Sequence, residues 1–139
     1  PQDVILLVQL RNGSRVSEAV NAMKRFCETN STFFYLEASK HGRLRPITIP
    51  SLPREAIIKT CEWLKSDINH VNAVKSYAHR HGLNTHSLRY AFITYLAKKG
   101  YDALTISKIT GHKQLNHLIT YLQSKRAEEV LRAEGEVLW

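Results

Sequence analysis

The chain has 139 residues, 43% of them hydrophobic, which suits one globular domain with its own core and leaves little room for a second. Twenty lysines and arginines oppose twelve aspartates and glutamates, and the net charge of +8 and pI of about 9.7 indicate a polyanionic partner, most simply nucleic acid. The longest apolar run near the start, residues 4–8, is far too short to span a bilayer and no lipidation signal is present, so membrane attachment is disfavoured.

Two helices are predicted at the start of the chain. Residues 3–10 form a short apolar helix that ends near Gly13, a residue that readily adopts positive φ. Apolar side chains then recur at i, i+3, i+4 and i+7 over residues 16–27, which predicts a second helix. Ser14 or Ser17 could cap its N-terminus.

Residues 32–50 have the pattern of a β-hairpin. TFFYLEA is rich in β-branched and aromatic residues, KHG is a turn signal, and RLRPITI is a second extended run closed by Pro50. Pro46 lacks an N–H and would have to face an unpaired edge. The turn region is a basic finger that could reach a DNA groove, although charged turns are also common on protein surfaces. Its basic residues are Lys40, His41, Arg43 and Arg45.

Helices are predicted for the rest of the chain. They cover residues 52–64, 71–81, 86–99, 104–109, 115–123 and 124–134, with glycines at positions 82, 100 and 111 as stop signals. In the helix that begins at His86, an apolar stripe that includes Tyr95 is expected to face the core. The predicted fold class is therefore mainly α with a small β-hairpin, in one domain with residues 124–139 as a C-terminal tail helix.

The cysteines and histidines give no sign of a metal site. Cys27 and Cys61 form neither a CxxC motif nor another paired spacing, so we expect no disulfide scaffold, no zinc site and a reducing, cytoplasmic environment. His79 and His81 lie two apart and would point to different faces of a helix. The chain begins at Pro1 without a methionine or targeting segment, so we expect a fragment of a longer protein.

Two stretches place arginine where it could bind a phosphate. In GSRVSEA, Arg15 lies in the break between two predicted helices, with Glu18 three residues later. A guanidinium can bind two oxygens of one phosphate while a carboxylate holds it in place. In HSLR, His86 and Arg89 lie three apart and therefore share a helix face. Taken singly, a solvated arginine with a surface salt bridge is the simpler interpretation of Arg15.

A third stretch, GHKQLNHLITYLQ, joins a histidine to a tyrosine. His112 follows the helix-stopping Gly111 at once, and Tyr121 comes nine positions later on the next predicted helix. His112 could be an ordinary partner of a helix C-terminus, and Tyr121 could be a core residue. These separate interpretations do not explain why the motifs occur together.

The chain resembles the catalytic domain of the tyrosine recombinases. The resemblance rests on four motifs in the family's order: GxRxSE, HxLRxxF, GH and a tyrosine nine residues after that histidine. That family includes phage and archaeal viral integrases and Xer-type enzymes, and type IB topoisomerases share its chemistry. The resemblance runs from about residue 4 to Tyr121. It implies one catalytic domain over residues 1–139, with the family's N-terminal DNA-clamping domain absent. Tyr90 departs from the pattern, since many members carry a second histidine there.

The resemblance also implies roles for the motif residues. The catalytic set would be Arg15, Lys40, His86, Arg89, His112 and the nucleophile Tyr121. Glu18 would support Arg15, and the DNA-binding residues would be Lys40, His41, Arg43, Arg45 and Lys113. The implied reaction passes through a 3′-phosphotyrosyl link, which conserves the bond energy, so no cofactor, ATP or metal is required.

The implied partner is double-stranded DNA at specific attachment sites, in the integration or excision of a mobile or viral element. Family members commonly pass a C-terminal segment to a neighbour in a tetramer on two duplexes, and the tail here ends in the apolar residues 137–139. The tail could instead cap its own domain. Two other functions stay open: a non-catalytic DNA-binding module of the same fold, and a helix-turn-helix regulator using residues 104–122, which leaves Arg15, Lys40 and His86 unexplained.

Overall fold

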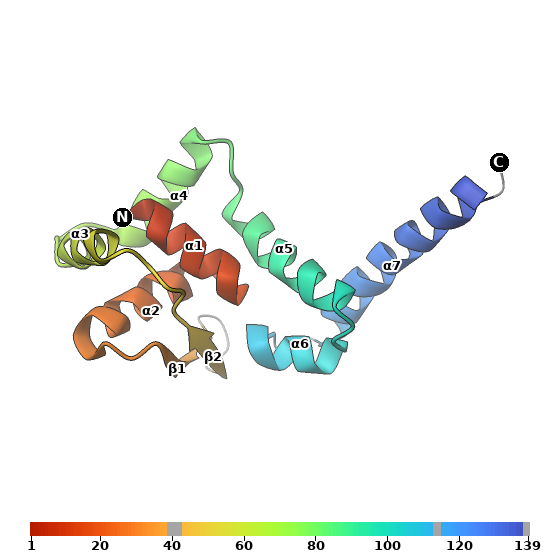
Figure 1. Cartoon of the computed structure of the whole chain (residues 1–139), viewed down its shortest axis with the longest axis horizontal. Coiled ribbons are helices and arrows are strands. Elements are labelled where there is room, and N and C mark those ends of the chain that lie inside the picture. Colours follow the sequence, from red (N-terminus) through yellow and green to blue (C-terminus); the bar gives the residue numbers. More distant parts are fainter. Residues whose placement is uncertain (39–42, 113–114, 138–139) are drawn as a thin grey trace.

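The computed structural model describes residues 1–38, 43–112 and 115–137. Within these ranges the chain forms seven helices and one two-stranded sheet, which confirms the predicted mainly α class with a small hairpin (Figure 1). The elements in chain order are α1 (Gln2–Asn12), α2 (Val16–Thr29), β1 (Phe33–Glu37), β2 (Leu44–Thr48), α3 (Arg54–Leu64), α4 (His70–Arg80), α5 (Thr85–Lys98), α6 (Ala103–Thr110) and α7 (Leu115–Val137).

The break between α1 and α2 has the predicted glycine but a different cap. Gly13 ends α1 in the left-handed region, with φ 57°. Neither Ser14 nor Ser17 caps α2. The N-cap residue is Arg15, and its backbone N–H donates to Glu18 Oε1 at 3.0 Å. A carboxylate three residues into the helix thus binds the N-cap amide, as in a capping box.

The hairpin is antiparallel, with Tyr35 opposite Pro46 and Leu36 opposite Arg45. The Ala38 N–H donates to the Arg43 carbonyl at 2.7 Å, and hydrogen-bonded pairs alternate from there, so Pro46 falls in a non-hydrogen-bonded pair. Its nitrogen therefore faces the open edge, as predicted. Arg45 and Ile47 face the protein interior, whereas Leu44 on the same strand is exposed.

The apolar residues gather in two clusters. The larger cluster contains α1, α2, the hairpin and α4, with α1 packed against α2, α4, α5 and β2. The smaller cluster joins α5, α6 and the start of α7. We call the elements around the larger cluster the larger body and those around the smaller cluster the smaller body; Figure 1 shows α5 running from the larger body to the smaller one. On α5 the buried side chains are Arg89, Ile93 and Leu96, whereas Tyr95, expected in the core, is 55% exposed.

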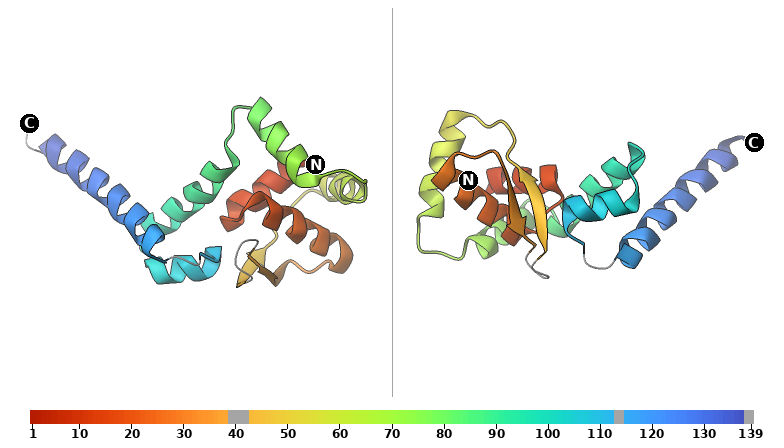
Figure 2. Two further views of the ribbon diagram at one scale, coloured as in Figure 1. Left: turned by 180° about the vertical axis from the view of Figure 1, so that it is seen from behind. Right: turned by 90° about the horizontal axis from the view of Figure 1, so that it is seen from below.

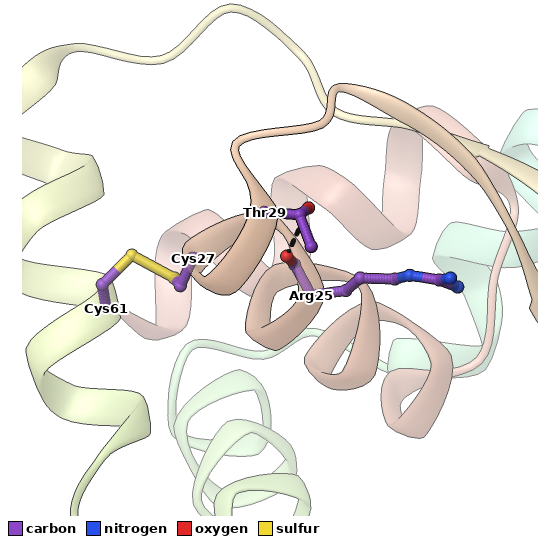
Figure 3. The surroundings of a disulfide bond; sticks show 4 residues. All are labelled: Arg25, Cys27, Thr29 and Cys61. Atoms are coloured by element: carbon purple, nitrogen blue, oxygen red, sulfur yellow. Dashed lines mark hydrogen bonds between the residues drawn. A yellow bond between two sulfur atoms is a disulfide. The ribbon is translucent and has the colours of Figure 1, made fainter.

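Cys27 and Cys61 form a disulfide with a Cα–Cα distance of 5.7 Å, which contradicts the expectation that the spacing of the cysteines indicates no disulfide. The bond links α2 to α3, in the larger body (Figure 3). The two cysteines are 34 positions apart in the sequence, and the segment between them includes the whole hairpin. Their pairing depends on how two helices pack, and no local spacing motif encodes that contact.

The C-terminal region is one continuous helix, α7, and not the two pieces predicted on either side of residue 123. Figure 2 shows that α7 leaves the body and that its C-terminal end stands apart from the other elements. Side chains 123–134 are all exposed. Among the described residues, no helix combines the length and apolar character needed to cross a membrane.

Candidate active site

Glu18 is the centre of a cluster of charged side chains. Its side chain is 1% exposed, and its carboxylate lies 3.4 Å from Arg15, 3.4 Å from Arg45 and 3.8 Å from Arg89. The arginines come from the α1–α2 break, from β2 and from α5. Three guanidinium groups around one carboxylate leave an excess of two positive charges, which is an arrangement suited to an anion.

Arg89 is 1% exposed and held by backbone groups from two distant segments. One terminal nitrogen donates to the Gly13 carbonyl at 3.2 Å, and the other donates to the Thr110 carbonyl at 3.3 Å. Burial lowers the Arg89 pKa to about 10, with the Arg15 charge as the next cause, so the side chain remains a cation at neutral pH. A buried guanidinium whose two terminal nitrogens are both hydrogen-bonded already has a fixed orientation, so it can bind a ligand without a further loss of side-chain entropy.

Arg15, His86 and Arg89 line one pocket, as the shared helix face of HSLR predicts. Arg15 is partly exposed there, so a ligand could reach it. Lys75 of α4 lines the same pocket and adds a further cation that no sequence motif indicated. A phosphate in this pocket would meet side chains from the α1–α2 break, α4 and α5.

His112 lies directly after α6 and reaches Arg89, since its Nδ1 is 3.2 Å and its Nε2 is 3.4 Å from Arg89 Nη2. Thr110 Oγ1 is 2.5 Å from Nδ1 and donates its proton to the Ile106 carbonyl at 3.0 Å. This pattern favours the tautomer with Nδ1–H donating to Thr110 and Nε2 accepting from Arg89. Burial, followed by the Arg89 charge, lowers the His112 pKa to about 4, so the ring is neutral at pH 7.

Tyr121 lies outside this pocket. Its hydroxyl is 2.9 Å from Thr94 Oγ1 on α5, and its ring packs on Tyr90 with 4.7 Å between centroids. Tyr121, Tyr90 and Thr94 line a second pocket that contains neither Arg15 nor Arg89. Tyr90 stands between the two sites, because its ring also contacts His86 at 5.1 Å and His112 at 6.5 Å.

The structure brings together most of the residues proposed from sequence. Arg15, Glu18, Arg89 and His112 form one connected network, and His86 lines the same pocket as two of them. Tyr121 is connected to that network only through Tyr90 among the contacts described above.

The hairpin residues proposed to bind DNA have different outcomes. Arg43 is exposed, as a DNA contact requires, whereas Arg45 is 0% exposed and its guanidinium is bonded to protein groups, which does not favour the predicted DNA contact. Its side chain points inward because β2 alternates faces and residue 45 shares the buried face with Ile47. Lys40, His41 and Lys113 lie outside the described residues.

Several polar residues of the site had no signal in the sequence. Thr110 serves the site through its carbonyl and its hydroxyl, and Thr94 holds the Tyr121 hydroxyl. Gln9 and Ser14 line the Arg15 pocket, and Gln9 Oε1 and Ser14 Oγ are buried without a hydrogen-bond partner in the part of the chain that the structure describes. Unpaired buried polar atoms at a pocket are available to bind a polar ligand.

No cluster of three or more metal-binding side chains occurs among the described residues.

Comparison with known proteins identifies the family of the chain. Residues 64–128, which include His86, Arg89, His112 and Tyr121, match the model of the phage integrase family. "Putative integrase ORF241" of Acidianus two-tailed virus is 45% identical over 92% of this chain and 54% of its own length. The chain belongs to the phage integrase family.

Two further relatives of this family member have different names. "Uncharacterized protein MJ0770" of Methanocaldococcus jannaschii is 30% identical over 96% of this chain and 73% of its own length. "Tyrosine recombinase XerA" of Thermococcus onnurineus is 25% identical over 96% of this chain and 54% of its own length. The chain therefore spans about half the length of the Acidianus virus and Thermococcus relatives. No solved structure matches it significantly.

Proposed function

We propose that this integrase-family chain is the catalytic domain of a site-specific DNA recombinase that cuts and rejoins strands through a 3′-phosphotyrosyl intermediate. The observation that supports the proposal is the convergence of Arg15 and Arg89 on the single carboxylate of Glu18, with His112 in contact with Arg89. The excess positive charge fits a phosphodiester, whose negative charge grows on the non-bridging oxygens during in-line attack. His86, at the rim of the same pocket, is placed to exchange protons with solvent or with a bound strand.

The proposed reaction is a balanced transesterification. The Tyr121 oxygen forms a bond to phosphorus while the bond from phosphorus to the 5′-oxygen breaks. The phenol proton passes to His86, and the leaving oxygen takes a proton from a lysine. The sequence motif proposes Lys40 for that role, and Lys75 lines the pocket as an alternative. The reverse attack by a 5′-hydroxyl reseals DNA, so the proposal requires neither ATP nor a metal.

The nucleophile has to leave Thr94 in this proposal. A free phenol is mostly protonated at neutral pH, and a cationic pocket favours its phenolate once the oxygen reaches that pocket. Movement of α7 could bring Tyr121 to its own Arg15 and Arg89, or could deliver it to the pocket of a second copy. The exposed second half of α7 is compatible with either route.

The proposed partners are double-stranded DNA at specific attachment sites and further copies of the chain. Arg43 and the hairpin turn would contact the duplex together with Lys113, and α7 would reach a neighbour in a tetramer on two duplexes. The proposed biological role is integration or excision of a mobile or viral element. These statements extend the family assignment, because the chain spans only part of the named recombinase.

The test is covalent trapping on a duplex that carries the attachment site flanking the gene. The duplex is nicked near the cleavage position, so that the short cut end diffuses away and the covalent intermediate accumulates. The parent chain is expected to form a protein–DNA adduct, and Tyr121→Phe is expected to bind the duplex within about twofold but form no adduct, because it lacks only the attacking oxygen. Tyr90→Phe is the matched control, since it removes the hydroxyl of the neighbouring tyrosine. An adduct with the Tyr121 variant would overturn the assignment of the nucleophile.

One observation favours a second function, that of a DNA-binding module without turnover. The Tyr121 hydroxyl is bonded to Thr94 and lies in a pocket separate from Arg15. Under that alternative, parent and Tyr121→Phe bind DNA equally and neither forms an adduct at any protein concentration. The same trapping experiment therefore decides between the two functions.

A further inference from the structure

Arg45 is a buried arginine that the proposed reaction does not use. It projects from β2 into the protein and is 0% exposed. Burial lowers its pKa to about 10, the Glu18 carboxylate opposes that shift, and the side chain remains charged at neutral pH. A buried cation is costly to the fold unless its donors are paired, so its partners indicate what it does.

The Arg45 guanidinium joins three segments that are distant in sequence. Nη2 donates to the Asn12 carbonyl at the end of α1, and Nη1 lies 3.4 Å from the Thr110 carbonyl at the end of α6. Nη1 also lies 3.4 Å from Glu18 Oε1 at the start of α2. Nε donates to the carbonyl of Pro46 at 3.3 Å. All three nitrogens are therefore engaged with protein groups.

Two of these partners are shared with Arg89. Both arginines approach Glu18 Oε1, and both donate to the Thr110 carbonyl. Thr110 in turn contacts the His112 ring through its hydroxyl. A displacement of Arg45 would therefore act on the aim of Arg89 and on the orientation of His112.

The surroundings hold Arg45 itself in place. The Asn12 side chain forms two hydrogen bonds with the Thr48 backbone, at 2.8 and 2.9 Å, and so fixes β2 to the end of α1. Gly111 has φ 73°, and a Cβ there would lie 3.0 Å from Ala38 Cβ and 3.5 Å from Arg45 Cβ. The turn that carries His112 thus packs directly on the Arg45 stem.

We propose that Arg45 is a positioning residue, which aims Arg89 and His112 by holding Glu18 and the Thr110 carbonyl, and which does not contact DNA. The proposal rests on the proposed function, since it assumes that Arg89 and His112 act on a phosphate. It requires arginine at this position, because a lysine keeps the charge but cannot direct three nitrogens at partners in three directions.

The first experiment separates binding from chemistry in the full-length chain, with duplex affinity and single-turnover adduct formation measured on the nicked duplex. Arg45→Lys and Arg45→Met are expected to slow adduct formation at saturating DNA by about 100-fold, the cost of misplacing reacting groups by about 1 Å. Duplex affinity is expected to change by less than about threefold, because a buried side chain makes no phosphate contact.

The matched controls are the same changes at Arg54, an exposed residue at the start of α3. Arg54→Lys and Arg54→Met are expected to leave both quantities unchanged. Arg43→Met, on the exposed part of the hairpin, is expected to weaken duplex binding. Weaker binding by Arg45→Lys with a parental rate at saturation would overturn the proposal, because that result identifies Arg45 as a DNA contact.

The second experiment does not depend on activity. In nitrogen-15 NMR of the full chain, the Arg89 guanidinium hydrogens of the parent are expected to exchange slowly, since they are buried and bonded to Gly13 and Thr110. In Arg45→Lys they are expected to exchange at least about tenfold faster, while the amide of Ile93 in the core of α5 keeps its protection.

The two experiments separate the possible failures. If the parent forms no adduct, the proposed function fails and the exchange of the Arg89 hydrogens still tests the role of Arg45. If Arg45→Met does not fold, Arg45→Lys decides, because it retains a cation beside Glu18. Parental adduct rate together with parental Arg89 exchange in Arg45→Lys would overturn the positioning role.

Discussion

The state of His112 follows from the arginines around it. Its lowered pKa has burial as the main cause, and Arg89, Arg15 and Arg45 all act in the same direction against the opposing Glu18 charge. A ring that is neutral at pH 7 can accept a hydrogen bond from Arg89 and donate one to Thr110, but it adds no charge to the site. The cationic character of the pocket therefore comes from arginine and lysine.

The lowered pKa of His112 makes the free energy of unfolding depend on pH. Above pH 6.5 the ring is neutral in both the folded and unfolded chain, but between 6.5 and about 4 only the unfolded chain takes up the proton. The folded state therefore loses stability as pH falls through that range. We expect the free-energy difference between the parent and His112→Gln, which cannot titrate, to shift against the parent on going from pH 7.5 to pH 5. Urea unfolding at both pH values measures it, and an unchanged difference would contradict the lowered pKa.

At the scale of single residues, sequence could predict the polar groups that belong to a motif. Spacing indicated two local pairs, Arg15 with Glu18 and His86 with Arg89, because a helix break and helix geometry fix their directions locally. That the two pairs meet was implied by the family resemblance and depends on the packing of α5 against the α1–α2 break. The burial of Arg45 could not be predicted, because it depends on which face of the hairpin packs on α1 and α6. Lys75 and Thr94 carry no motif and are brought to the site only by tertiary packing.

At the scale of elements, the disulfide is the feature that most constrains the larger body. It joins α2 and α3 across 34 residues, and closing a loop of that size in the unfolded chain is worth about 4 kcal/mol in the chain-entropy description. Reduction is therefore expected to lower the free energy of unfolding by roughly that amount. Urea unfolding with and without a thiol reductant measures the difference.

The double variant Cys27→Ala and Cys61→Ala serves as the control for that experiment. It is expected to match the reduced parent and to be insensitive to reductant. Equal unfolding midpoints for the oxidised and reduced parent would show that the bond contributes nothing to stability. The bond does not by itself identify a compartment, because intracellular proteins of some hyperthermophiles also contain disulfides.

The sequence predicted whether a segment is a helix or a strand better than it predicted where that segment ends. Apolar periodicity identified the helices and the aromatic, β-branched runs identified the hairpin, because both patterns reflect local burial. The division of α7 at residue 123 was wrong, since no glycine or proline interrupts the helix there and i, i+3 ion pairs continue it. Lys125 lies 3.7 Å from Glu128, and Arg126 lies 3.9 Å from Glu129.

At the scale of the whole molecule, the prominent feature is the long helix α7, whose side chains from residue 123 to residue 134 are all exposed. Leu118 and Leu122 attach the start of α7 to α5 and α6, whereas Val130 and Leu131 are 44% and 74% exposed. An isolated helical segment of this length is marginal in water, and exposed apolar side chains on it gain stability when a partner covers them. A neighbouring copy, as proposed for the recombining tetramer, would supply that cover.

Leu131→Glu tests this proposal without changing the pocket. We expect it to reduce the fraction of two-duplex complexes by at least about tenfold, since a charge buried in an apolar contact costs about 1.4 kcal/mol or more, while affinity for a single duplex stays within about twofold. Sedimentation of the chain on labelled duplexes measures both. Ala133→Glu is the matched control, because it adds the same charge at an exposed position of the same helix. Equal assembly of the Leu131 variant and the parent would exclude this part of α7 from the contact between copies and leave its apolar residues as simple surface.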